Sequence, residues 1–144
     1  MNWIFATDNS FAYVILRAGL AVTFFFHGTQ HVFGWWGGRG FNGMVKNWHE
    51  KYSKPIFLCW LAMFIEVSGV LAMTFGFLVR PAAFGIACFM LMAIKESHWG
   101  NGFFLAQGPG RGSGIEYCLA LALMALALVF GGAGALSVDG LLSR

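Results

Sequence analysis

Long uninterrupted apolar stretches dominate the chain and predict four membrane-spanning helices. The stretches lie at about residues 11–33, 55–78, 81–99 and 115–136, and each is near the ~20 apolar residues that a spanning helix needs. The third is short if it stops at Lys95 and reaches residue 99 if that side chain extends to the membrane surface. The fourth contains LALALMALAL, which alternates as a strand would, but so long an apolar run favours a helix. We therefore predict an all-α protein, a transmembrane four-helix bundle that forms a single integral membrane domain over residues 1–144.

Composition supports lipid as the surrounding solvent. Hydrophobic residues make up 58% of the 144 residues, aromatic residues 17% and charged residues only 10%. A soluble domain carries roughly 25% charged residues, and a chain of this size cannot hide so much apolar surface from water. Disorder is excluded for the opposite reason, because it requires low hydrophobicity. The net charge of +3 is too weak and too interrupted to indicate a nucleic-acid partner.

Lys and Arg residues are distributed unevenly between the two sides of the predicted bundle. The side with the two long links carries Arg39, Lys46, Lys51, Lys54, Lys95 and Arg111. The other side carries Arg80 and Arg144, with Arg17 added if its side chain reaches the surface. Since cytoplasmic loops are enriched in Lys and Arg, we expect the long links to be cytoplasmic and both termini to be outside.

Three charged residues fall within the predicted spans, apart from Lys95 and Glu96 at the end of the third. Arg17 lies in the first, Glu66 lies about halfway along the second, and Glu116 lies just inside the fourth. A charge at the centre of a membrane helix costs at least ~2.5–3.5 kcal/mol, so such residues usually have a partner and a function. We expect a structural ion pair between Arg17 and Glu66; the alternative is that one of them binds a polar ligand or carries protons.

Histidines, carboxylates and tryptophans gather at the side of the long links. His27 and His31 are four residues apart and share one helix face. The residues expected near them are Gln30, Trp35, Trp36, Trp48, His49, Lys95, Glu96, His98, Trp99 and Glu116. Three interpretations are open: an interfacial belt of aromatic residues, a site for a quinone-type headgroup, or a metal site.

The quinone and metal interpretations assign different roles to the same residues. In a quinone site His27, His31 and His98 would handle protons or bind the headgroup, with Glu116 or Glu96 behind them. Gln30, Trp35, Trp36 and Trp99 would then line the site. In a metal site His27 and His31 would chelate the ion, and a carboxylate or His98 would complete the coordination.

Two other features receive simpler interpretations. Cys59, Cys88 and Cys118 are isolated within predicted helices and are expected to be small packing residues. The segment FNGMVKNWHEKY, residues 41–52, is aromatic and basic. It is expected either to lie on the membrane surface as an amphipathic segment or to cover the His27/His31 site as a lid.

Taken together, these segments resemble the DoxX family of four-helix membrane proteins. The similarity is carried by LRAGLAVTFFFHGTQHVFG, IEVSGVLAMTFGFLVRPAA, HWGNGFF, IEYCLALALMALAL and GGAGALSVDGLL, in that order along nearly the whole chain. By this resemblance Arg17, His27, Gly28, Glu66, His98 and Glu116 correspond to the polar positions of the family. The chain has His31 where a Lys often follows the Gln, which makes the His27/His31 face more like a metal site.

The resemblance implies a multi-pass protein of the bacterial inner (plasma) membrane that is linked to redox work. One branch of the family resembles the membrane subunit of thiosulfate:quinone oxidoreductase, whereas distant eukaryotic relatives act as cargo receptors or assembly chaperones. A fold hosts many functions, so membership does not settle activity.

Two hypotheses follow for function. The leading one is a redox subunit that interacts with the quinone pool, a possible quinone-linked oxidoreductase subunit. The chain has no visible flavin, iron–sulfur or haem site, so an electron-donating partner subunit is expected. The alternative is a non-enzymatic accessory or assembly subunit that packs against a partner complex or forms a homo-oligomer.

Overall fold

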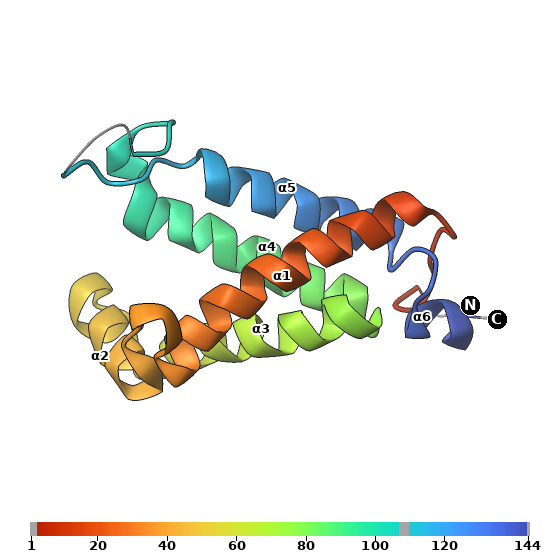
Figure 1. Ribbon diagram of the computed structural model, residues 1–144, viewed down its shortest axis with the longest axis horizontal. Helices are drawn as coiled ribbons and strands as arrows, with labels where there is room; N and C mark the ends of the chain where they lie inside the picture. Colours follow the sequence, from red (N-terminus) through yellow and green to blue (C-terminus); the bar gives the residue numbers. More distant parts are fainter. Residues whose placement is uncertain (1–2, 107–109, 144) are drawn as a thin grey trace.

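The described part of the chain is entirely helical. A computed structural model describes residues 3–106 and 110–143 (Figure 1). In chain order the elements are α1 (Phe11–Phe33), the 3₁₀ turn η1 (Trp35–Gly37), α2 (Gly40–Tyr52), α3 (Ile56–Phe75), α4 (Val79–Ala93), the π-helical turn η2 (Ile94–His98), the 3₁₀ turn η3 (Trp99–Asn101), α5 (Glu116–Gly131) and α6 (Val138–Leu142). No strand occurs in these residues, so the all-α prediction is confirmed.

Local chemistry sets the ends of the long helices. The Ser10 side chain accepts a hydrogen bond from the Ala12 N–H and caps α1, as expected for an N-cap serine. Gly34, at φ 72°, ends α1 in the left-handed conformation typical of a helix C-terminus. α5 ends at Gly131, before the predicted residue 136, because the chain turns at Gly132. A Cβ on Gly132 would lie 2.6 Å from the Ala6 carbonyl oxygen, so this turn requires a glycine.

The helices form two limbs that meet at one end of the molecule. Figure 1 shows α2 and α3 along one limb and α4 with α5 along the other, while α1 crosses from the C-terminal end of α5 to α2 and α3. The limbs converge where the N- and C-terminal segments lie, and they diverge toward the links 34–55 and 94–115. We call the first region the terminus end and the second the loop end. The divergence leaves room between the limbs at the loop end, which is where the candidate site lies.

The core runs along the line where the limbs meet. Leu20 and Phe24 of α1 pack in one cluster with Ile86 of α4 and Leu128 of α5, and each is at most 2% exposed. Large apolar side chains also face outward; Phe64 is 67% exposed. Two of the described helices, α1 and α3, are long and apolar enough to cross a membrane, and α5 is a shorter apolar helix.

The predicted Arg17–Glu66 ion pair is wrong. Arg17 is 3% exposed and donates hydrogen bonds to the carbonyl oxygens of Met73, Ala135 and Leu136 at the terminus end. Glu66 instead contacts His31. α1 and α3 are antiparallel, and Arg17 precedes His31 by fourteen residues. Glu66 lies level with Gly28 of α1, eleven residues after Arg17, so at ~1.5 Å per residue Arg17 is roughly 16 Å from Glu66 along the helix axis, too far for the two side chains to meet.

Two further buried charges, Asp139 and Arg80, hold the terminus end together. Asp139, 1% exposed, accepts hydrogen bonds from the N–H groups of Leu78 and Val79 at 2.8 and 2.9 Å and so caps α4. Arg80 donates to the carbonyl oxygens of Ala6 and Val129. These contacts tie α4 to both terminal segments of the chain.

Candidate functional site

A cavity of about 470 Å³ lies between the two limbs at the loop end. Its size is within the ~300–1,000 Å³ range of small-molecule sites, which are typically apolar with a few placed polar groups. The lining follows this pattern, because most of it is apolar and the polar side chains come from several different elements. The polar groups that matter most below are His27, His31, Trp48, Glu66, His98 and Tyr117.

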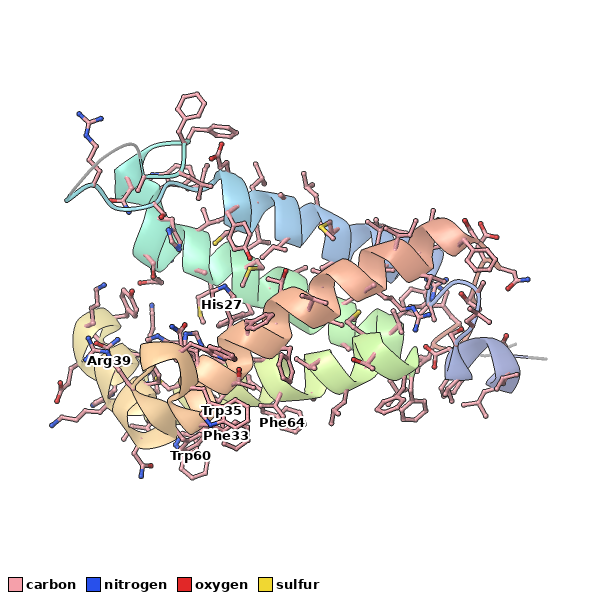
Figure 2. All side chains as sticks on the ribbon, viewed as in Figure 1. His27, Phe33, Trp35, Arg39, Trp60 and Phe64 are labelled. Atoms are coloured by element: carbon pink, nitrogen blue, oxygen red, sulfur yellow. The ribbon has the colours of Figure 1, made fainter. Side chains whose placement is uncertain are left out.

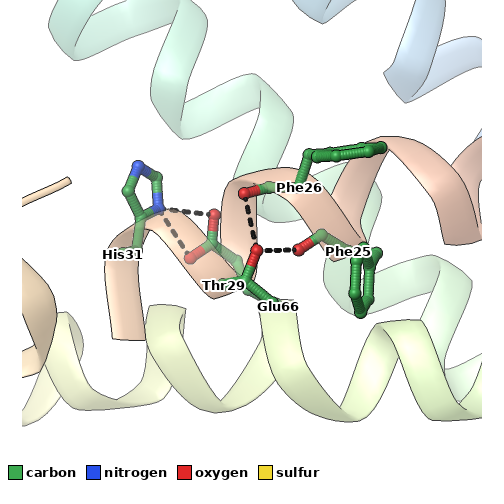
Figure 3. Close-up of polar contacts among 5 residues, drawn as sticks. All are labelled: Phe25, Phe26, Thr29, His31 and Glu66. Carbon is green, nitrogen blue, oxygen red and sulfur yellow. Dashed lines mark hydrogen bonds and ion pairs between the residues drawn. The ribbon is translucent and has the colours of Figure 1, made fainter. Parts of the chain in front are cut away.

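His31 and Glu66 form the central polar contact of the cavity (Figure 3). The His31 Nδ1 atom lies 3.0 Å from Oε1 and 2.8 Å from Oε2 of Glu66. Glu66 is 1% exposed, and the His31 side chain is 18% exposed. A carboxylate can only accept, so Nδ1 carries the hydrogen that is donated to it. The Nε2 atom, on the other side of the ring, is then left for a ligand in the cavity.

His27 lies one helical turn from His31 on the same face of α1. The centroids of the two imidazole rings are 6.0 Å apart, and the His27 ring lies 6.4 Å from the ring of Tyr117 on α5. Figure 2 shows His27 directed from α1 into the space between the limbs. His27 and His31 therefore present two imidazoles to one cavity, and Tyr117 faces them from the opposite limb.

α2 covers the cavity at the loop end. Trp48 contacts His31 edge-to-face with a centroid distance of 5.5 Å, and it also packs 6.1 Å from the ring of Phe89 on α4. The Tyr52 hydroxyl is 2.6 Å from the Ser97 hydroxyl. Lys54 forms an ion pair with Glu96 at 2.9 Å. α2 was expected either on the membrane surface or over the site, and these contacts place it over the site.

The predicted site residues separate into two groups. His27, His31 and His98 line the cavity; the Nδ1 atom of His98 lies 2.7 Å from the Ser113 carbonyl oxygen. Glu116 does not line it, because its carboxylate accepts a hydrogen bond from the Leu105 N–H at 2.8 Å. Glu116 therefore holds the 102–116 loop against α5 and does not support a histidine.

The residues predicted to surround a cofactor lie elsewhere. Gln30 directly precedes His31, so its side chain points about 100° away from His31 around the helix. The Gln30 side chain donates a hydrogen bond to the Trp36 carbonyl oxygen. The Trp36 indole N–H donates to the Thr29 hydroxyl, which itself bonds the Phe25 and Phe26 carbonyl oxygens (Figure 3). Trp35 and Trp99 point outward, at 53% and 71% exposed. Figure 2 shows Trp35 beside Phe33, Trp60 and Phe64, away from His27.

Sequence reasoning missed Tyr117 and the contact between Glu66 and His31 in this cavity. Pairing Glu66 with Arg17 assumes that α1 and α3 end at the same level. The His31–Glu66 contact shows that the helices are staggered, with the first turns of α3 extending beyond the end of α1. Trp48 was expected near the two histidines, and the lid interpretation of residues 41–52 agrees with its place in the lining.

The structure adds no third ligand to His27 and His31 for the proposed metal site, within the residues it describes. Within residues 3–106 and 110–143, no group of three or more His, Cys, Asp or Glu side chains is arranged to hold a metal ion. His27 and His31 remain neighbours on α1, and the carboxylate nearest to them, Glu66, is used by His31.

Comparison with known proteins gives one match. The model of the DoxX family matches residues 12–99, which include α1, α2, α3, α4 and most of the histidines and carboxylates described above. A search of curated proteins and a search of solved structures returned no match.

Proposed function

The chain belongs to the DoxX family of membrane proteins, and from this premise we propose that it is a multi-pass redox subunit of the bacterial inner membrane. In this proposal α1, α3, α5 and the continuous helix α4–η2 cross the bilayer, and the loop end faces the cytoplasm. The subunit exchanges electrons between the quinone pool and an electron-donating partner subunit.

The His31–Glu66 contact within an apolar cavity is the observation that carries this proposal. A quinone needs an apolar pocket, a hydrogen-bond donor or acceptor at its carbonyl oxygen, and a group that exchanges protons near neutral pH. Histidine is the side chain best suited to the last role. Both oxygens of Glu66 lie against Nδ1 of His31, which fixes the ring and directs Nε2 to the ligand.

Each polar residue of the cavity receives a specific role. Reduction of a quinone to a quinol takes up two electrons and two protons. His31 delivers a proton through Nε2 to one carbonyl oxygen, while Glu66 stabilises the imidazolium before that transfer and holds the ring in place. His27, one turn away and 6.0 Å from His31 between ring centroids, supplies the second proton to the other carbonyl oxygen. The two electrons come from the partner subunit.

Native purification tests this proposal. The protein would be extracted in lipid nanodiscs from its own membrane, and bound quinone, metals and co-purifying chains would be measured in one preparation. We expect about one quinone per chain, and loss of that quinone in the His27→Ala, His31→Ala double variant with its melting temperature retained. His49→Ala is the matched control, because His49 is exposed and bonds only the Lys54 carbonyl oxygen.

The alternative function makes the opposite prediction. A preparation without quinone but with a stoichiometric partner, unchanged by the double variant, would overturn the redox proposal. It would leave an accessory or assembly subunit in which the histidines serve packing.

A further inference from the structure

The loop end of the cavity is closed by a strap, which we define as α2 and the residues after it up to Lys54. The strap is fastened to η2 by the Tyr52–Ser97 hydrogen bond at 2.6 Å and the Lys54–Glu96 ion pair at 2.9 Å. Because Tyr52 and Lys54 follow α1 and precede α3 in the chain, these two contacts join the diverging limbs directly. They close the side of the cavity that faces the long links.

η2 supplies the other half of this closure. Glu96, Ser97 and His98 are consecutive, yet all three line the cavity. In a regular α-helix, consecutive residues are rotated by about 100°, so three in a row cannot share a narrow face. The wider π-helical turn reduces this rotation, and π-helical turns occur frequently at functional sites. The π-helical turn at the end of α4 therefore presents Glu96 to Lys54 and Ser97 to Tyr52 of the strap.

The side of the cavity between α1 and α5 is different. His27 and Tyr117 line the cavity and are also exposed, with Tyr117 at 40%. Their rings are in contact, with centroids 6.4 Å apart, but the two residues form no hydrogen bond with one another in the described chain. Neighbouring outward positions on these helices are apolar, including Phe26 at 49% and Leu123 at 58% exposed.

We infer that the cavity takes its ligand sideways from the bilayer, between α1 and α5, and that the strap closes it to the aqueous phase. The ligand is therefore a membrane-dissolved amphiphile: its polar ring lies at His31 Nε2, and its apolar tail leaves between α1 and α5, where only the contact between the His27 and Tyr117 rings has to separate. This inference deepens the proposed function and rests on it for the chemistry of the headgroup. The route of access can be tested without any quinone.

Two cysteines in the cavity lining can report how reagents enter it. Cys59 and Cys118 are buried and line the cavity, whereas Cys88 is exposed on α4. In a Cys88→Ala background reconstituted in liposomes, the labelling rates of Cys59 and Cys118 would be measured by mass spectrometry. The probes are a neutral, lipid-soluble methanethiosulfonate and its sulfonated, membrane-impermeant analogue, which share one reactive group. We expect the neutral reagent to label at least tenfold faster.

Strap variants should change only the aqueous route. Lys54→Ala with Tyr52→Phe should raise the rate of the sulfonated reagent at least fivefold and leave the neutral reagent unchanged. The matched control is Lys46→Ala, which removes another lysine of the strap, one that forms an exposed ion pair with Glu50 at 3.8 Å. The charge exchange Lys54→Glu with Glu96→Lys should restore slow labelling, which separates loss of the strap from general unfolding.

The lateral opening is tested by added bulk. Tyr117→Trp should slow the neutral reagent at least threefold, while Phe130→Trp, at a 78% exposed position on the same helix, should not. Equal rates for the two reagents in the parent protein, or no response to the strap variants, would overturn the inference. Neither result depends on quinone, so failure here would leave the native-purification test of the proposed function intact, and the converse also holds.

Discussion

The two ends of this bundle treat buried charge in opposite ways. At the terminus end, Arg17, Arg80 and Asp139 bond to backbone carbonyl and N–H groups. At the loop end, His31 and Glu66 bond to each other and border a cavity. Both solutions give the buried charges polar partners, although among the described residues the Arg17 Nε atom has none; only the second solution places its charged side chains beside space that a ligand can fill.

This difference indicates that the buried charges at the terminus end stabilise the fold, whereas those at the loop end serve ligand binding. Backbone groups are fixed partners, so the Arg17 and Asp139 contacts specify where helices end and how the terminal segments dock. A side-chain pair such as His31–Glu66 is costly to bury and is often replaceable by apolar residues without loss of stability. We therefore expect substitutions at the terminus end to change stability and substitutions at the loop end to change ligand binding.

The largest effect is expected at Arg17. Arg17→Met would leave the carbonyl oxygens of Met73, Ala135 and Leu136 buried without this donor. Loss of a buried charged partner costs about 3–5 kcal/mol, so the free energy of unfolding in mixed micelles should fall by about that amount. A change of less than about 1 kcal/mol would show that the terminus end does not depend on this residue.

Asp139 should rank next. Asp139→Ala removes the acceptor for two N–H groups at the start of α4, and hydrogen bonds to a charged group contribute about 1.5–3 kcal/mol each. We expect a loss of about 2–4 kcal/mol of unfolding free energy, and roughly half of it for Asp139→Asn, which keeps one acceptor. Both variants that fold should bind quinone as the parent does.

His31 should show the reverse pattern. His31→Phe keeps a ring against Trp48 but removes the nitrogen that faces the ligand. An unmade hydrogen bond of about 1.5–3 kcal/mol corresponds to a 10- to 100-fold higher dissociation constant for decylubiquinone. The unfolding free energy should change much less than in Arg17→Met. Equal losses of stability at the two residues would remove the distinction between the ends.

Glu66 gives the smallest and most discriminating effect. Glu66→Gln keeps the shape and one acceptor for His31, but the amide can also donate, so the ring is no longer fixed in one tautomer. Mutation of a partner that orients a histidine in this way typically lowers metal affinity or activity about tenfold or more. We expect the dissociation constant for decylubiquinone to rise by about tenfold. Isothermal titration in nanodiscs measures it, and unchanged affinity would show that Glu66 does not position His31.

More of the fold than of the candidate site could be predicted from the sequence. The all-α class and the DoxX resemblance follow from apolar runs and local motifs, and both are confirmed. The Arg17–Glu66 pair is wrong because α1 and α3 are staggered, which the sequence of neither helix shows. Glu116 lies outside the cavity lining because its carboxylate accepts from the Leu105 N–H, a contact that depends on tertiary structure. Helical spacing alone places His27 and His31 on one face, and both line the cavity, while their chemical roles stay predictions.

The most direct test of the account is photo-crosslinking with an azido-quinone in nanodiscs, with adducts mapped by mass spectrometry and competed by decylubiquinone. We predict competed adducts on the cavity residues His31, Trp48 and Tyr117, and loss of these adducts in Glu66→Gln. Adducts spread over outward positions such as Phe64 and Phe130, insensitive to competitor and to Glu66→Gln, would contradict a quinone site at the loop end.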